Sequence, residues 1–502
     1  MKNSIVSLFA LSLALGPVSL SAEDDPSDYD AVKEVGEQVE RIKAHNEGED
    51  GLNAVITYSY TAGFKAREMS DVGILRGRTV LVKDNIETEE FPTTAGSLAL
   101  RYNFTRRDAP LIANMRAAGG VVLGKANLSE WANIRSNDST SGWSAVGGLT
   151  RNPHAIDRNS CGSSSGSGSA VAAGFAWAAI GTETNGSITC PASINGVVGF
   201  KPSVGIVSRT HVVPISSTQD TAGPMTKTVY DAALLLTAIA GEDPSDSATL
   251  EAVRVRDYTE ELSDYSLDGV RIGVMREQIG SNAQVAKVFE RALDDLEAAG
   301  AELVDIEFEP NNEMFGNSFT VLMYELREEM GKYLAAIPEI DGGDTPRTLE
   351  DLIAFNTANS DTELRWFDQS LFELAEETTD REAYEAARET AVRIAGEETL
   401  DMLFATHGVQ FLVAPTRGPA WMSDLVLGDQ FNGSIGFGSP AAIAGYPHLT
   451  VPMGHVERLP VGISFFGAKW ADHGVLKVGA AYERARSARL PEPSFKRWSP
   501  EE

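Results

Sequence analysis

Short apolar runs that alternate with helical stretches constrain the fold of this chain most. Such runs lie at residues 79–82, 121–123 and 197–198, and they return at 411–413 and 461–466. A run that is apolar throughout is typical of a strand buried on both faces. The alanine- and leucine-rich segments between the runs have helical spacing. The alternation predicts an α/β fold: a single large α/β/α layered domain in which helices cover a mixed β-sheet.

The other segments favour one compact unit. Residues 27–70 have apolar positions at helical spacing and are predicted to be helical, as is 231–239. The acidic segment 245–405 is predicted to consist mostly of amphipathic helices, with one strand at 270–274. Because no repeat or low-complexity linker divides the chain, residues 23–502 are predicted to form one domain.

The N-terminus has the pattern of a secretory signal. Lys2 precedes a short apolar stretch, and small residues then lead into an acidic segment that begins at Glu23. The apolar stretch is too short to span a bilayer, and Gly16-Pro17 would break a helix. A buried N-terminal helix or an anchor is the alternative. We expect residues 1–22 to be a signal peptide and the mature protein to be periplasmic or secreted, without a membrane contact after cleavage.

The charge balance excludes one class of partner. The formal net charge is −30, and no basic stretch interrupts it, so a phosphate backbone would be repelled. Nucleic acid is therefore not expected as a partner. The seven histidines contain no pair at metal-ligand spacing, so neither a metal nor another cofactor is expected. The sequence does not indicate an oligomeric state.

Two serine-bearing, glycine-rich loops stand out between residues 151 and 202. One contains Ser163 and the other Ser187. A helix over 167–175 would rise about 13 Å, and a strand over 176–181 would return about 20 Å. If the two elements lie antiparallel, both loops meet at one edge of the sheet and share a site. Flexible connectors are the alternative for loops of this composition.

Two known serine-hydrolase patterns fit poorly. Residues 162–166 match the Gly-x-Ser-x-Gly nucleophile elbow, which requires a strand immediately before it. The preceding residues, 151–159, have the composition of a loop. The Ser-x-x-Lys motif of β-lactamases is absent, because no lysine lies three residues after a serine.

Several linked blocks resemble the amidase-signature family. Three motifs of the family occur here in the same order: a Gly-Ser-rich loop, Gly-Thr-x-x-x-Gly-Ser and Gly-x-x-Gly-x-Lys-Pro. A Val-Lys-Asp segment precedes them, as it does in the family. The matching blocks are 82–85, 124–131, 162–168, 181–191, 196–202, 219–225 and 459–462. The resemblance covers nearly all of the chain after the leader and is weakest over 245–405. It implies the amidase-signature fold and an amide substrate, either a small molecule or a peptide.

The resemblance also implies a Ser–Ser–Lys triad. The family's nucleophile corresponds to Ser187, its bridging serine to Ser163 and its lysine to Lys83, and the backbone of Thr184, Asn185, Gly186 and Ser187 would bind the oxyanion. A serine hydroxyl needs a base. A lysine can act as that base only when neutral, so its pKa must fall from about 10.4 toward 7 or 8. Burial at the end of an apolar strand can supply that shift.

Departures from the common pattern narrow the substrate. Asn185 stands where many members have glycine, and Thr189 stands where many have an arginine that suits small anionic substrates. The blocks around Ser187 resemble the bacterial peptide amidases, which remove the terminal amide of C-terminally amidated peptides. A broad aryl or aliphatic acylamidase, the glutaminase component of a tRNA-dependent amidotransferase and a periplasmic binding protein on the same fold remain alternatives. Cys161 and Cys190 flank the two loops; two buried thiols are favoured, and a disulfide in an oxidising compartment stays open.

Overall fold

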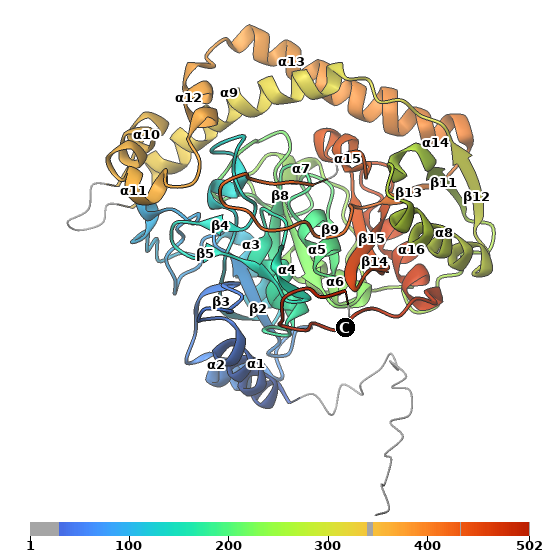
Figure 1. Cartoon of the computed structure of the whole chain (residues 1–502), viewed down its shortest axis with the longest axis horizontal. Coiled ribbons are helices and arrows are strands. Elements are labelled where there is room, and N and C mark those ends of the chain that lie inside the picture. The colour runs from blue at the N-terminus through green and yellow to red at the C-terminus, as the bar shows by residue number, and fades with distance from the viewer. Residues whose placement is uncertain (1–29, 339–344, 432, 501–502) are drawn as a thin grey trace, which may run out of the picture.

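One mixed sheet of eleven strands runs through the molecule (Figure 1). The computed structural model describes residues 30–338, 345–431 and 433–500, so the predicted leader lies outside the described residues. The strands, in spatial order, are β1 (Val55–Tyr58), β3 (Val121–Ala126), β2 (Thr79–Lys83), β8 (Ala178–Glu183), β10 (Thr221–Thr226), β9 (Val198–Lys201), β14 (His448–Val456), β15 (Leu459–Phe466), β13 (Phe411–Pro415), β11 (Arg271–Met275) and β12 (Glu302–Ile306).

The sheet has a seam between its N-terminal and C-terminal halves. Strands β3, β2 and β8 are parallel at one end, and β13, β11 and β12 are parallel at the other. The strands between them pair antiparallel. Among the described strands, only the β9–β14 ladder joins the halves, with Leu449 opposite Phe200. All six strands on one side of this ladder come from residues 55–226, and all five on the other come from residues 271–466.

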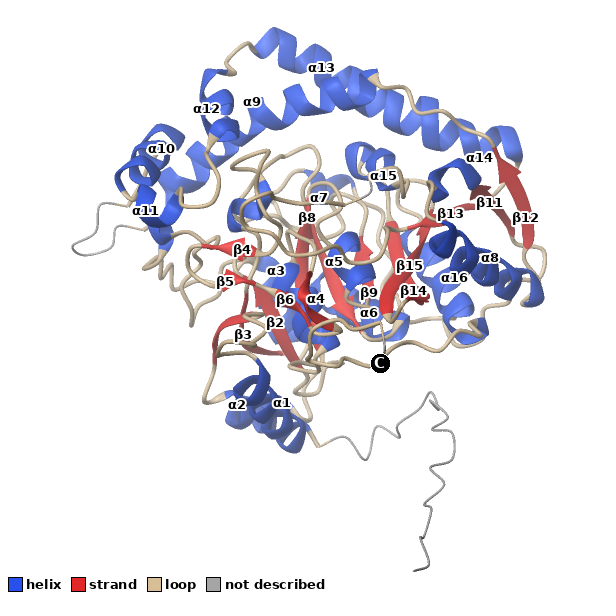
Figure 2. Ribbon diagram, viewed as in Figure 1, coloured by secondary structure: helices blue, strands red, loops and turns tan. Residues whose placement is uncertain are grey.

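Helices cover both faces of the sheet, as Figure 2 shows. Successive strand side chains point to opposite faces, so Val80 and Val82 of β2 enter one core and Leu81 enters the other. The helices of the first core are α3 (Pro110–Ala117), α6 (Val229–Ile239), α8 (Ala283–Ala298) and α16 (Asp472–Ala485); those of the second are α1 (Ala31–His45), α2 (Ala62–Met69), α4 (Ser165–Ala172) and α5 (Thr189–Ile194). The predicted α/β layered fold is confirmed.

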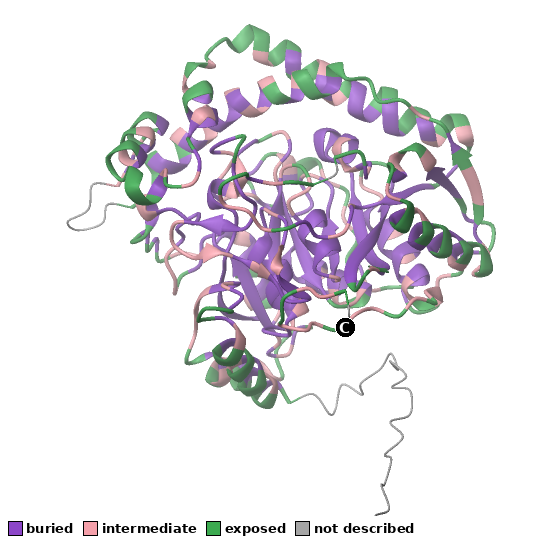
Figure 3. Cartoon of the chain, in the orientation of Figure 1, coloured by how far each residue is buried: buried purple, intermediate pink, exposed green. Residues whose placement is uncertain are grey.

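A helical arm, residues 313–338 and 345–407, crosses above the sheet. Its long members, α9 (Glu313–Ala336) and α13 (Arg381–Ala395), pack against each other. Figure 3 shows an exposed outer surface and buried inner positions along them. The inner side of α13 repeats small or apolar residues at helical spacing, namely Ala387, Ala391 and Ile394. The shorter helices of the arm are α10 (Leu349–Ala358), α11 (Ser360–Glu363), α12 (Ser370–Glu377) and α14 (Met402–His407), and α15 (Gly438–Ala444) follows β13.

Three local expectations were wrong. Residues 27–70 are not continuously helical, because β1 lies between α1 and α2 and pairs with β3. The acidic segment contains a second strand, β12, whose exposed edge position tolerates its acidic residues. Residues 151–159 form a two-stranded hairpin, β6 (Arg151–Asn152) and β7 (Ala155–Asn159), outside the main sheet. Within the described residues, no helix is both long and apolar enough to cross a membrane.

Candidate active site

Lys83 is the last residue of β2, and its side chain is completely buried. Its Nζ lies 2.8 Å from Ser163 Oγ, 2.8 Å from Thr182 Oγ1 and 3.2 Å from the Thr182 carbonyl oxygen. Burial lowers the pKa of Lys83 to about 7, although the charges of Asp220 and Glu183 oppose the shift. A buried ammonium is costly to desolvate, so the neutral and the charged forms of this lysine are both well populated near pH 7.

The hydrogen bonds of Lys83 suit a base. A neutral amine has two N–H donors and one lone pair, so only two of its three bonds can be donated by Nζ. The Thr182 carbonyl can only accept, and therefore a hydroxyl must donate to the amine. Thr182 Oγ1 already accepts from the Asn85 amide at 3.0 Å. Accepting that bond still lets the Thr182 hydroxyl donate, so the hydroxyl that donates to the neutral amine is that of Ser163 or of Thr182.

The loop before α4 brings Ser163 beside the Ser187 loop. The Gly162–Ser163 peptide bond is cis, and the N–H of Ser164 donates to the Ser187 carbonyl at 3.1 Å. The predicted meeting of the two serine loops at one sheet edge is therefore confirmed. Ser164, the elbow position in the Gly-x-Ser-x-Gly match, is buried and bonds to the backbone of Thr182 through its hydroxyl. Although β7 precedes this loop, it lies outside the central sheet, so the match is not a nucleophile elbow.

The four residues from Thr184 to Ser187 form a loop between β8 and α5. The Glu183 carboxylate fixes its far end by accepting from the N–H groups of Ile188 at 2.8 Å and Thr189 at 2.9 Å. Gly186 adopts a φ of 87°, which disfavours a side chain. The N–H groups of Asn185, Gly186 and Ser187 donate to no other group in the described part of the chain. Free N–H groups beside a half-exposed serine can bind an oxyanion.

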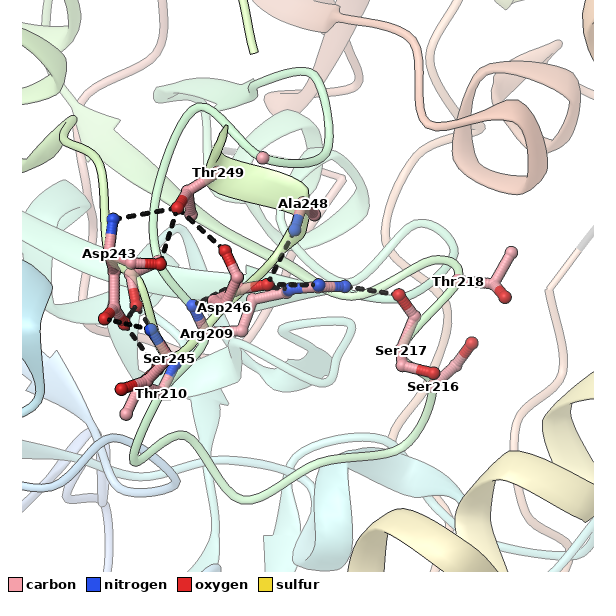
Figure 4. Close-up of polar contacts among 12 residues, drawn as sticks. Arg209, Thr210, Ser216, Ser217, Thr218, Asp243, Ser245, Asp246, Ala248 and Thr249 are labelled. Atoms are coloured by element: carbon pink, nitrogen blue, oxygen red, sulfur yellow. Dashed lines mark hydrogen bonds and ion pairs between the residues drawn. The ribbon is translucent and has the colours of Figure 1, made fainter. Parts of the chain in front are cut away.

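Asp220 holds the start of that loop. Its carboxylate accepts from Thr184 Oγ1 at 2.5 Å and from the N–H groups of Ile215 and Ser216 at 2.8 and 2.9 Å. Figure 4 shows contacts that hold the preceding residues: the Arg209 guanidinium forms two hydrogen bonds to the Asp246 carboxylate, at 2.9 and 2.6 Å, and a third to the carbonyl oxygen of Ser217. The segment that carries Asp220 is therefore rigidly positioned.

The prediction that the two cysteines are buried free thiols was wrong. Cys161 and Cys190 form a disulfide with a Cα–Cα distance of 6.0 Å. The residues before Ser163 and after Ser187 are brought together by the same loop contact that aligns the serines, which places the thiols within bonding reach. The disulfide packs beside Ile194, Ala420 and Trp421.

A cavity of about 280 Å³ opens beside the Ser187 loop. Asn185, Gly186 and Thr189 form its floor, and Arg417 and Thr416, which follow β13, form one wall. The arm contributes Met314 and Phe315. Such a cavity can hold the acyl part of a substrate whose carbonyl lies at the free N–H groups. Among the described residues, no group of three or more histidine, cysteine or acidic side chains is arranged to hold a metal ion.

Comparison with known proteins defines the class of enzyme. A family model described as Amidase matches residues 36–476. A probable amidase of Arabidopsis thaliana is 35% identical over 433 residues, which are 84% of this chain and 79% of that protein. A glutamyl-tRNA(Gln) amidotransferase component from Caldanaerobacter subterraneus is 32% identical over 463 residues, 89% of this chain and 91% of that protein. The solved structure of native peptide amidase from Stenotrophomonas maltophilia superposes with a TM-score of 0.87 at 44% identity, covering 93% of this chain and 96% of that one.

The chain is an amidohydrolase that acts on amides. It belongs to the amidase-signature family. The predicted likeness to bacterial peptide amidases is confirmed by the structural match.

Sequence reasoning missed three contributors to the site. Thr182 contacts Lys83 twice; it is the threonine of the Gly-Thr-x-x-x-Gly-Ser block, whose resemblance did not specify this contact. Asp220 falls inside a recognised block, whose resemblance did not specify its contact with Thr184. Arg417 is distant in sequence from the other site residues, and no motif marks it.

Proposed function

We propose that this protein is an exported peptide amidase that converts C-terminally amidated peptides into peptide acids and ammonia. The observation that carries the proposal is the buried Lys83–Ser163 hydrogen bond, with the pKa of Lys83 lowered to about 7 and the Ser187 loop alongside. A neutral buried amine that is hydrogen-bonded to a serine hydroxyl can act as a general base.

In the proposed mechanism, Ser187 is the nucleophile. Its Oγ attacks the amide carbon while its proton passes to Ser163, and the proton of Ser163 passes to Lys83. The oxyanion is bound by backbone N–H groups in the loop Thr184, Asn185, Gly186 and Ser187. Collapse of the tetrahedral intermediate breaks the C–N bond, and the amine accepts the proton that returns through Ser163. Ammonia leaves, water then attacks the acyl-enzyme by the same proton route, and the acid is released with Ser187 restored.

The substrate assignment has two supports. The cavity beside Gly186 accommodates an acyl group larger than that of a simple aliphatic amide. The structural match is to a protein named as a peptide amidase, at 44% identity across almost the whole chain. An aryl or aliphatic acylamidase would share the triad and differ only in the shape of this cavity.

Export is supported by the disulfide as well as by the predicted leader. Disulfides persist in oxidising compartments and are rare where thiols are kept reduced. The Cys161–Cys190 bond therefore agrees with a periplasmic or secreted location. The same argument disfavours the cytoplasmic amidotransferase component, despite 32% identity to one such protein.

The test is ammonia release from a C-terminally amidated dipeptide by purified wild type, Ser187→Ala, Ser163→Ala and Lys83→Ala. We expect release by the wild type and loss in all three variants. Ser167→Ala is the matched control, because Ser167 lies near Ser163 but its hydroxyl donates to the Ile180 carbonyl. If the wild type hydrolyses an anilide but releases no ammonia from the amidated peptide, the protein is an acylamidase and the peptide-amidase assignment is wrong. Full activity in Ser187→Ala would refute the mechanism.

A further inference from the structure

Arg417 is a cation without a polar partner at the edge of the proposed active site. It follows β13, is half-buried and lines the cavity together with Gly186 and Thr189. Its guanidinium forms neither a hydrogen bond nor an ion pair with any residue that the structure describes. One face of it lies 4.9 Å from the centre of the Phe431 ring. That contact uses the π-face of the ring and leaves the five N–H donors of the guanidinium unused.

Two carboxylates lie near Arg417, but neither bonds to it in the described part of the chain. Glu183 and Asp429 are close enough for their charges to raise the pKa of Arg417 against the lowering effect of burial. However, only Oε2 of Glu183 accepts from the backbone after Ser187, and its buried Oε1 has no hydrogen-bond partner among the described residues. Asp429 accepts from Ser141 N–H at 3.0 Å, from the Ser141 hydroxyl at 2.5 Å and from Trp421 Nε1 at 3.2 Å. Arg417 is therefore available to a ligand and remains charged.

The Arg417 guanidinium lies beside Gly186, the residue that precedes the proposed nucleophile. An added Cβ on Gly186 would be 3.8 Å from Arg417 Nη2, and Ser187 is the next residue. A substrate carbonyl bound at the N–H groups of this loop would thus have the Arg417 guanidinium in its immediate surroundings. The same cavity is also lined by the apolar side chains of Met314 and Phe315, which can contact the stem of the substrate side chain.

We infer that Arg417 forms a carboxylate-binding subsite, so that the preferred substrates are amides whose acyl part carries a carboxylate close to the scissile bond, such as peptides ending in Glu-NH2 or Asp-NH2. The inference rests on the proposed peptide-amidase function and names its substrate class. The planar guanidinium fork matches a carboxylate in two parallel bonds. A partly desolvated charge without a partner gains most from such a ligand. Thr189 indicated that small anionic substrates would be disfavoured, but Arg417 supplies a cation to the same cavity from another part of the chain.

The test compares acetyl-Gly-Glu-amide with acetyl-Gly-Met-amide, a neutral peptide of similar length. For the wild type we expect kcat/KM from ammonia release to be about tenfold or more higher with the glutamate peptide, as for a hydrogen bond to a charged group. Arg417→Met should abolish that preference while still cleaving the methionine peptide. Arg417→Lys should keep part of it, because a point charge replaces the fork. Arg365→Met is the control, since Arg365 also stacks on an aromatic ring, that of Trp366, and does not line the cavity.

Calorimetry separates this inference from the chemistry. In Ser187→Ala, the glutamate peptide should bind about tenfold more tightly than the methionine peptide, and adding Arg417→Met should equalise the two. Equal affinities, or no binding of either peptide, would overturn the carboxylate subsite. Ammonia release from the methionine peptide by the wild type decides separately whether the peptide-amidase function stands.

Discussion

The sheet region that carries Lys83 and the two serines differs sharply from the helical arm above it. In residues 79–226, Lys83, Ser163 and Ser164 are completely buried, and Lys83 and Ser164 bond to the carbonyl oxygen of Thr182 in the adjacent strand, whereas Ser187 is half-exposed. The arm has an exposed outer surface (Figure 3), and it lines the cavity with Met314 and Phe315. We therefore expect the sheet region to set the reactivity and the arm mainly to shape the space around the substrate.

The largest effect on activity is expected from replacing Lys83, the proposed base in the sheet region. Lys83→Arg keeps a positive charge but cannot become neutral, so we expect kcat/KM to fall about a thousandfold or more. Lys83→Met should lose as much activity, yet its unfolding midpoint in urea should not fall below that of the wild type, because no buried amine then needs desolvation. Activity retained in Lys83→Arg would show that the amine provides only charge.

Breaking the disulfide tests whether the sheet region depends on its covalent link. Cys161 and Cys190 are 29 residues apart, so Cys161→Ser with Cys190→Ser should cost about 2–4 kcal/mol of unfolding free energy. The measurement is urea denaturation of oxidised wild type, reduced wild type and the double variant. Reduction should leave the midpoint of the double variant unchanged. Identical midpoints for oxidised and reduced wild type would contradict the expectation.

The pH profile should report Lys83. Its pKa of about 7 lies below the usual value, so the active neutral form is lost as pH falls through 7. Between pH 8 and pH 5, kcat/KM should therefore decrease about a hundredfold. Asp220→Asn should move the profile to lower pH, because the Asp220 charge raises the pKa of Lys83. A flat profile, or a shift toward higher pH, would argue against Lys83 as the titrating base.

The smallest effect is expected where the arm touches the Ser187 loop. The buried Ser318 hydroxyl of α9 donates to Gln219 at 2.8 Å, and Gln219 donates to the Thr184 carbonyl at 3.3 Å. Ser318→Ala removes one hydrogen bond worth about 1 kcal/mol, so kcat/KM should fall only severalfold. Thr320→Ala is the control, since that hydroxyl donates within α9 to the Gly316 carbonyl. A loss as large as that of Lys83→Arg would remove the distinction between the two regions.

Prediction from sequence succeeded for features that produce a recognisable pattern in a short stretch of residues. The apolar run before Lys83 indicated a buried strand, and the spacing of Ser163 and Ser187 predicted that their loops meet. The position of β1 could not be predicted, because a four-residue strand between two helices has too little pattern of its own. Arg417 was missed for another reason: its closeness to Gly186 arises from sheet pairing between distant segments, which a linear pattern does not contain.

The single seam between β9 and β14 has a consequence for how the chain folds. All six strands on the N-terminal side pair only with one another and, through β9, with β14. Their pairings are complete once residue 226 has been made, whereas the seam must wait for residues 448–450. Contacts this distant in sequence form slowly, because a long loop must close first. We therefore expect the lysine and serine loops to be assembled early during synthesis, with closure of the seam as the late step that adds Arg417 and completes the substrate cavity.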